Sequence, residues 1–289
     1  MMLMERVGDG SVRVRVKRYR KQKLVSRLSD SGFEEDFAAS PTPLLVDDSA
    51  AEVSCWYLQY GDVGYRIQRE REALFYPCKS LALQPQVTAD ARCQLVSWLI
   101  PVHKHFRLSF ECCCLTVNIM DRFLACMPVA ADCFQLLGLT ALLLASKKVE
   151  VFSPSISQLL SLCCAAFTRE QLCNLECLIL LRLDFRLDAP TLAFFLDYHA
   201  SRTEASRHRV DLARKVCELS LADYAFDKYA PSLTAECALS LAGELLRESR
   251  DDVENLRGNA LARECRNNLK LLAALNSLTA IDGERRHWE

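Results

Sequence analysis

The chain has 289 residues, of which 51% are hydrophobic and 25% are charged, and its formal net charge at pH 7 is -1. This is the composition of a globular protein large enough to bury a sizeable core, which excludes a wholly disordered chain. The near-neutral charge argues against non-specific binding of nucleic acid or membrane surfaces by the whole molecule.

The first 55 residues are predicted to form a disordered tail. Residues 13–23 hold seven positive charges, whereas residues 28–65 contain acids and no Lys or Arg. A basic block followed by an acidic block is typical of a solvated, unpacked segment. The basic block is interpreted as a nuclear-import or nucleic-acid patch, or simply as part of that solvated tail.

The first ordered elements are predicted between residues 56 and 105. Residues 57–76 suggest an amphipathic helix ended by Pro77, and residues 78–87 form a linker, so 56–87 is treated as one N-terminal section. Thr88 is a plausible N-cap for a helix that runs to about residue 105 and is interrupted by Pro101. Its apolar stripe consists of Leu95, Trp98, Leu99 and Val102.

Four further helices complete a predicted domain over residues 88–187. Ser109 is expected to cap a helix at 110–126. Residues 131–148 are apolar on nearly every face, which predicts a wholly buried central helix. A shorter helix follows Pro154, and the capping box at 168–171 opens the last helix, which runs to about 183.

A second helical series is predicted over residues 188–280, before a short tail at 281–289. Helices are expected at 190–200, 209–224, 231–248 and 259–279, with Pro190 and Pro231 in first helical positions. No strand alternation appears outside the tail. The fold class is therefore predicted to be all-α, with a five-helix bundle around a buried central helix and then a second, shorter helical domain.

The fifteen cysteines are interpreted as small buried hydrophobes. Residues 1–14 lack the apolar core of a secretion signal, and the apolar run at 134–145 is too short to span a bilayer. We therefore expect a reducing cytoplasmic or nuclear location and no membrane association. No CxxC pair occurs and the five histidines lack metal-ligand spacing, so no metal and no cofactor is expected. His103 and His105 are predicted to be surface residues.

A few charges stand at unusual places in the apolar stretch at 92–148. Arg92 and Asp121 lie among apolar residues, where an unpaired charge would be costly. Lys147 and Lys148 end a run that has hardly any polar atoms. These four charged residues are therefore predicted to have a structural or functional role.

The same positions carry a resemblance to the cyclin family. Residues 92–99 (RCQLVSWL), 118–124 (NIMDRFL) and 142–148 (LLLASKK) resemble the first three helices of a cyclin box, and 175–180 (LECLIL) resembles the fifth. Segments 189–196 and 229–232 resemble parts of a second cyclin fold. Five signature positions fall in order: Arg92, Asp121, Leu136, Lys147 and Glu176.

The resemblance implies roles for these residues. Arg92 and Asp121 would form a structural ion pair between the first two helices of the box. Lys147 and Glu176 would hold the backbone ends of a kinase's mobile regulatory helix and the segment before it. Many cyclins follow this lysine with an aromatic residue and two acids, whereas this chain has Lys148, a valine and Glu150, so an unusual choice of kinase is expected.

A second implied surface is the groove in which cell-cycle cyclins dock Arg-x-Leu motifs. Leu95, Trp98 and Gln135 match it, but Ala91 and Gln94 stand where a Met and an Ile would be. Losing two apolar contacts of that size weakens such a groove by about 1–3 kcal/mol, so weakened docking is expected. The alternative is that Leu95 and Trp98 are simply core residues.

The expected function is that of a regulatory subunit that binds and activates a cyclin-dependent kinase. Segments 128–138, 171–177 and 219–226 resemble a branch of cyclins associated with centriole amplification and multiciliated cell differentiation. No catalytic motif is found, so the chain is not expected to be an enzyme. One alternative is a kinase-independent scaffold. Another is a tandem cyclin-fold nucleic-acid-binding adaptor; the near-neutral charge and the lack of a basic stripe in the helical region argue against it.

Overall fold

The structure is a computed structural model that describes residues 56–76, 80–164, 166–248 and 260–276, with side chains described from residue 61. Contacts divide the chain into residues 1–51 and a compact unit of residues 52–289. The predicted tails at 1–55 and 281–289 lie outside the described residues.

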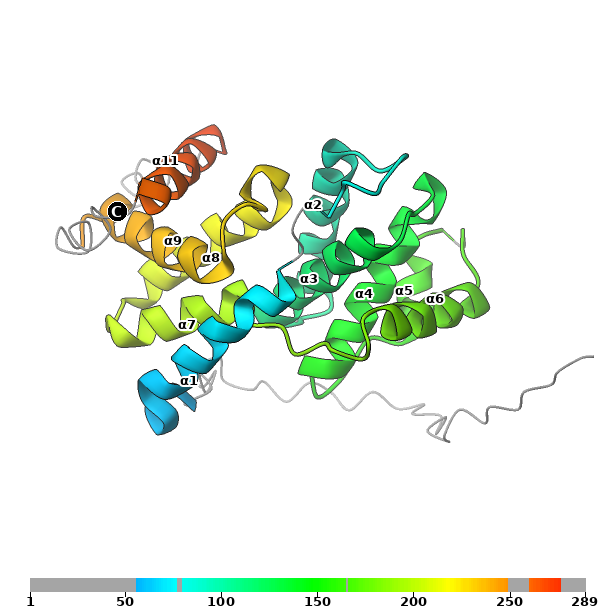
Figure 1. The fold of residues 1–289 in the computed structure, drawn as a ribbon, viewed down its shortest axis with the longest axis horizontal. Coiled ribbons are helices and arrows are strands. Elements are labelled where there is room, and N and C mark those ends of the chain that lie inside the picture. The colour runs from blue at the N-terminus through cyan, green and yellow to red at the C-terminus, as the bar shows by residue number, and fades with distance from the viewer. Residues whose placement is uncertain (1–55, 77–79, 165, 249–259, 277–289) are drawn as a thin grey trace, which may run out of the picture. The chain divides into compact units, whose positions relative to one another are not determined.

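The described residues contain helices and no strand, as the all-α prediction requires. Figure 1 shows the helices in chain order. The α-helices are α1 (Trp56–Glu72), α2 (Ala89–His105), α3 (Phe110–Cys126), α4 (Phe134–Val149), α5 (Ile156–Ser161), α6 (Arg169–Arg182), α7 (Leu192–Arg202), α8 (Arg207–Ala222), α9 (Pro231–Leu245) and α11 (Ala260–Leu275). Three 3-10 turns join them: η1 (Ala73–Phe75), η2 (Ala131–Cys133) and η3 (Tyr224–Phe226).

The predicted helix starts follow from side-chain caps. The hydroxyl oxygens of Thr88 and Ser109 accept hydrogen bonds from backbone N–H groups in the first turns of α2 and α3. Thr168 and Gln171 form a reciprocal capping box at the start of α6. Each cap satisfies N–H groups that have no partner inside the helix. Because only a few residue types can do this, these positions could be predicted from the sequence.

Several local expectations were wrong. Helix α2 ends at His105, as predicted, but Pro101 does not interrupt it. Thr191, rather than a residue before Pro190, caps α7, so the proline precedes the cap instead of opening the helix. His103 is buried, with 3% of its surface exposed, and burial lowers its pKa. Spacing in the sequence did not indicate this burial.

Two cores hold the fold together. The first surrounds α4, in which every residue from Phe134 to Ser146 except Gln135 is buried, as predicted for a central helix. The second lies between α7, α8, α9 and α11 and includes Phe195, Val216 and Leu241. Each helix can bury an apolar face because neighbouring helices supply the opposite face.

Polar contacts join the two helical sets. The carboxylate of Glu72, at the end of α1, accepts hydrogen bonds from the backbone N of Ser232 (2.7 Å) and from its hydroxyl (3.0 Å), and so caps the start of α9. Lys104 of α2 forms an ion pair with Glu218 of α8 at 2.6 Å. These contacts make α1 and both sets parts of one packed unit.

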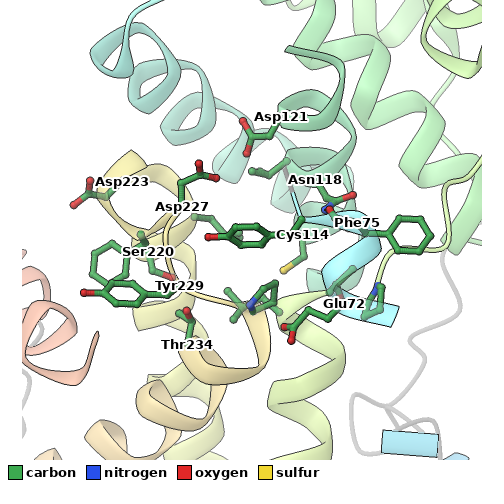
Figure 2. A pocket seen from close by; sticks show the side chains of 18 of the residues that line it. Glu72, Phe75, Cys114, Asn118, Asp121, Ser220, Asp223, Asp227, Tyr229 and Thr234 are labelled. Carbon is green, nitrogen blue, oxygen red and sulfur yellow. The ribbon is translucent and has the colours of Figure 1, made fainter. Parts of the chain in front are cut away.

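A small cavity of about 100 Å³ lies at this junction. Figure 2 shows Cys114 and Asn118 of α3 on one side of it, and Ser220 and Tyr229 on another. The amide nitrogen of Asn118 donates to the backbone oxygen of Phe75 at 3.0 Å, which attaches η1 to α3.

The described cysteines are free thiols, and burial raises the pKa of Cys112 and Cys113 to about 12. Such thiols are protonated and unreactive at neutral pH, as expected of small buried hydrophobes. Seven of the thirteen described cysteines are buried, but the prediction was wrong for four that are exposed: Cys126, Cys133, Cys164 and Cys177. Among the described helices, none combines the length and the apolar character that crossing a membrane requires. No group of His, Cys, Asp and Glu side chains in the described part of the chain is arranged to hold a metal ion.

Candidate functional site

Lys147 and Glu176 are brought together from two helices. The Nζ atom of Lys147, near the end of α4, lies 2.9 Å from Oε1 of Glu176, in the middle of α6. The lysine side chain is 49% exposed and the glutamate side chain 15% exposed. The pair therefore lies at the protein surface with its remaining donors and acceptors directed to a place that a partner can reach.

Large apolar side chains lie exposed on the same two segments. Val151 and Phe152, just after α4, are 89% and 87% exposed, and Leu181 and Phe185, at the end of α6 and beyond it, are 64% and 66% exposed. Exposed apolar side chains that gather in one region mark interaction surfaces. These four residues and the Lys147–Glu176 pair are called the clamp surface below.

Two other residues predicted to bind a kinase, Lys148 and Glu150, already have partners within the chain. The ammonium group of Lys148 lies 2.5 Å from a carboxylate oxygen of Asp188. Oε1 of Glu150 accepts hydrogen bonds from the backbone N (2.8 Å) and the hydroxyl (2.7 Å) of Ser109, which caps α3. Glu150 therefore supports the loop before α3, a role that the sequence did not indicate.

Arg92 and Asp121 form a buried, two-bonded ion pair. The Nε and Nη2 atoms of Arg92 donate to the two carboxylate oxygens of Asp121 at 2.8 and 2.7 Å. Each side chain is 5% exposed. Burial by itself lowers the pKa of Arg92, but the charge and hydrogen bonds of Asp121 raise it overall.

The same guanidinium also reaches the second helical set. Nη1 of Arg92 donates to the backbone oxygens of Leu221 (3.1 Å) and Ala222 (3.2 Å) at the end of α8. The four C-terminal carbonyls of a helix have no partner inside it, so this arginine satisfies two of them. The ion pair thus joins α2 and α3 to α8, which local sequence patterns could not show.

The residues of the implied Arg-x-Leu groove lie on α2 and α4. Leu95 is buried against Gly138, where an added Cβ would come within 3.1 Å of the leucine side chain. Gln94 is exposed, whereas Ala91, Trp98 and Gln135 are partly buried. Leu95 therefore belongs mainly to the core, and the accessible part of the groove consists of the other four residues.

Comparison with known families matches both helical sets. The family model for the cyclin N-terminal domain matches residues 64–188, and that for the cyclin C-terminal domain matches residues 190–258. The chain belongs to the cyclin family. The resemblance of the sequence motifs is thereby confirmed, and the tandem arrangement of two cyclin folds accounts for the two cores.

Similar cyclins are found among characterised proteins. Cyclin-O of Homo sapiens is 53% identical over 76% of this chain, and the match spans 66% of the human protein. Cyclin-O protein B of Xenopus laevis is 46% identical over 91% of this chain and 79% of its own length. Cyclin-A1 of Homo sapiens is 35% identical over 74% of this chain and 48% of its own length. The similarity is therefore greater to these Cyclin-O proteins than to this Cyclin-A1.

Solved structures show the same fold. A viral cyclin from herpesvirus saimiri superposes with a TM-score of 0.65 at 23% identity, over 72% of this chain and 96% of the viral chain. A chain of the yeast RNA polymerase II CTD kinase complex CTDK-1 superposes with a TM-score of 0.54 at 11% identity, over 71% of each chain.

Sequence reasoning left Val151 open as core or interface and did not single out the other exposed apolar residues of the clamp surface: Phe152, Leu181 and Phe185. Phe185 lies just after the predicted end of a helix at about 183, and Phe152 lies between two predicted helices. Only two signals pointed to them: each is a large apolar residue beside a helix end, and each lies close in sequence to charged residues. These signals do not separate an exposed residue from a buried one.

Proposed function

We propose that this cyclin is a regulatory subunit that binds a cyclin-dependent kinase through the clamp surface and thereby activates it. The observation that carries the proposal is the Lys147–Glu176 pair, which is partly exposed and belongs to the same two segments as four exposed large apolar side chains. Membership of the cyclin family supports the same surface.

The chemistry of the pair suits the ends of a helix. A lysine ammonium has three donors for the unpaired carbonyls at a helix C-terminus, and a glutamate accepts from unpaired N–H groups. Lys147 and Glu176 hold each other at 2.9 Å in the free protein, so they are positioned before a partner arrives. A kinase helix held in this way would be moved toward its active position, where it completes the kinase's Lys–Glu pair.

The double variant Lys147→Ala with Glu176→Ala is expected to weaken kinase binding by about 100-fold or more. Hydrogen bonds to charged groups contribute about 1.5–3 kcal/mol each, and two such groups are removed. Calorimetric titration of the full chain with cyclin-dependent kinases measures the effect. The thermal midpoint should stay nearly unchanged, because a partly exposed ion pair contributes only about 0–1 kcal/mol to stability.

The matched control is Lys104→Ala with Glu218→Ala. This pair has similar side-chain exposures, 54% and 11%, and also joins two helices, but lies on α2 and α8. It should leave kinase affinity unchanged. If the Lys147/Glu176 variant still binds the kinase, these two residues do not form the kinase-binding site. If the wild type binds no cyclin-dependent kinase, a kinase-independent scaffold is favoured.

We further propose a role in centriole amplification in multiciliated cells, in the cytoplasm or nucleus. The similarity to the Cyclin-O proteins supports this role. The clamp variant separates two mechanisms in cells that lack the protein. If kinase binding matters, the wild type restores centriole number and the variant does not; rescue by both would favour the kinase-independent scaffold.

Docking of Arg-x-Leu peptides is expected to be about tenfold or more weaker than that of cyclins with a complete apolar groove. Ala91 and Gln94 provide little apolar surface, and Leu95 is largely buried. Titration with a labelled Arg-x-Leu peptide measures the affinity. The variant Ala91→Met with Gln94→Ile should strengthen binding, and ordinary cyclin-like affinity in the wild type would contradict the expectation.

A further inference from the structure

A groove of about 700 Å³ lies beside the clamp surface. Three segments line it: the end of α1 with η1, the end of α3, and the turn after α6. The groove adjoins the clamp surface directly, because Phe185 belongs to both and Asp188 is the partner of Lys148.

Four arginines line this groove, and we call it the arginine groove: Arg71, Arg122, Arg182 and Arg186. In the described part of the chain, none of the four has a carboxylate oxygen within ion-pair distance. Two of them instead donate hydrogen bonds to backbone oxygens or to a side-chain amide oxygen. Nη1 of Arg122 donates to the backbone oxygen of Arg186 at 2.8 Å, and Nη2 of Arg71 donates to that of Asp188 at 3.1 Å.

The positive charge of the arginine groove is only partly balanced. Asp184 and Asp188 also line it, and Lys148 already neutralises Asp188. Burial and the nearby charge of Arg186 lower the pKa of Arg122, although an arginine stays charged at neutral pH. The site therefore holds guanidinium groups that repel one another and that an anion would stabilise.

The backbone and the apolar side chains shape the groove for a peptide. Asp184 and Phe185 have φ angles of 52° and 57°, an uncommon left-handed conformation for residues with side chains. This turn leaves the Phe185 side chain exposed at the edge of the groove, and Leu74 is 75% exposed at another edge. A bound segment could place apolar residues against both.

We propose that the arginine groove binds a phosphorylated serine or threonine in a segment of a partner protein. A phosphate monoester carries a charge of about -1.5 to -2 and three acceptor oxygens. These complement the excess of arginine charge in the groove, where four arginines face two acids of which Lys148 already pairs with one, and the planar donors of the guanidinium groups. The exposed Leu74 and Phe185 provide contacts for the residues beside the phosphate, which favours a peptide over a free anion.

The test uses the full chain and immobilised degenerate peptide libraries with a fixed central phosphothreonine, threonine or glutamate. The wild type should be retained by the phosphothreonine library at least tenfold better than by the threonine library, and retention should fall as salt increases. Arg182→Gln with Arg186→Gln should lose this preference at least tenfold. Both side chains are exposed, and the backbone oxygen of Arg186 that Arg122 uses remains.

Two variants serve as controls. Arg182→Lys with Arg186→Lys keeps the charge but loses the planar fork, so it should retain only part of the preference. Arg207→Gln, at an exposed position on α8, should behave as the wild type. Equal retention on the three libraries, unchanged retention of the Arg182/Arg186→Gln variant, or full displacement by inorganic phosphate at the peptide's own concentration would overturn the proposal.

Discussion

Replacing Asp121 with alanine is expected to lower the free energy of unfolding by about 3 kcal/mol or more. The substitution leaves the Arg92 guanidinium, which is 5% exposed, without its counter-charge. Breaking a buried pair by removing one partner costs about 3–5 kcal/mol, because the remaining charge stays out of water. Urea denaturation of the full chain measures the change, and an unchanged thermal midpoint would contradict it.

A double variant separates the loss of the pair from the cost of the remaining charge. Arg92→Met with Asp121→Ala leaves no buried charge, so it should be less destabilised than Asp121→Ala alone. Recovery should be incomplete, since the backbone oxygens of Leu221 and Ala222 lose their donor. The loss in free energy of unfolding of the double variant is compared with the sum of the losses of the two single variants. A larger loss in the double variant would show that the guanidinium does not require Asp121.

Replacing Glu111 with glutamine is expected to stabilise the protein at pH 8 by about 2–3 kcal/mol. Burial raises the pKa of Glu111 from 4.5 to about 7, opposed by the hydrogen bond that the Thr191 hydroxyl donates to it. Each pKa unit corresponds to about 1.4 kcal/mol. Glutamine keeps an oxygen that can accept from Thr191 and carries no charge to bury.

The sign of the pH dependence follows from proton binding. Between about pH 4.5 and 7 the folded protein keeps the proton of Glu111 while the unfolded chain releases it, so stability falls as pH rises through this window. The advantage of Glu111→Gln should therefore be largest above pH 7 and vanish near pH 4.5. Urea denaturation at pH 5 and pH 8 measures it, with the exposed Glu70→Gln as the control. An equal gain at both values would rule out the titration of Glu111 as its cause.

The helices were largely predictable because their determinants are local. Thr88, Ser109 and Thr168 cap the helices that they were expected to cap, and the mainly apolar run at 134–145 predicted the central α4. Pro101 was misinterpreted, because a proline inside a helix is tolerated when packing outweighs its local cost.

The candidate site was predictable only in part. The Lys147 and Glu176 positions came from the cyclin resemblance, and the structure brings their charged atoms to 2.9 Å. Their role in binding a kinase stays a prediction. Glu150 illustrates the limit: its position beside the lysines suggested a partner contact, but its carboxylate binds Ser109, which is 41 residues away along the chain.

Local sequence patterns were enough to predict the helical class, the buried α4 and the pairing of two charges in the core. Short stretches of sequence carry the hydrophobic periodicity, the helix N-caps and the cost of an unpaired buried charge. These properties can therefore be interpreted without coordinates. Coordinates were needed to show that Arg92 also binds the end of α8, that Phe152 and Phe185 are exposed, and that four arginines line one groove. These facts depend on which distant segments pack together, and local residue patterns do not specify that packing.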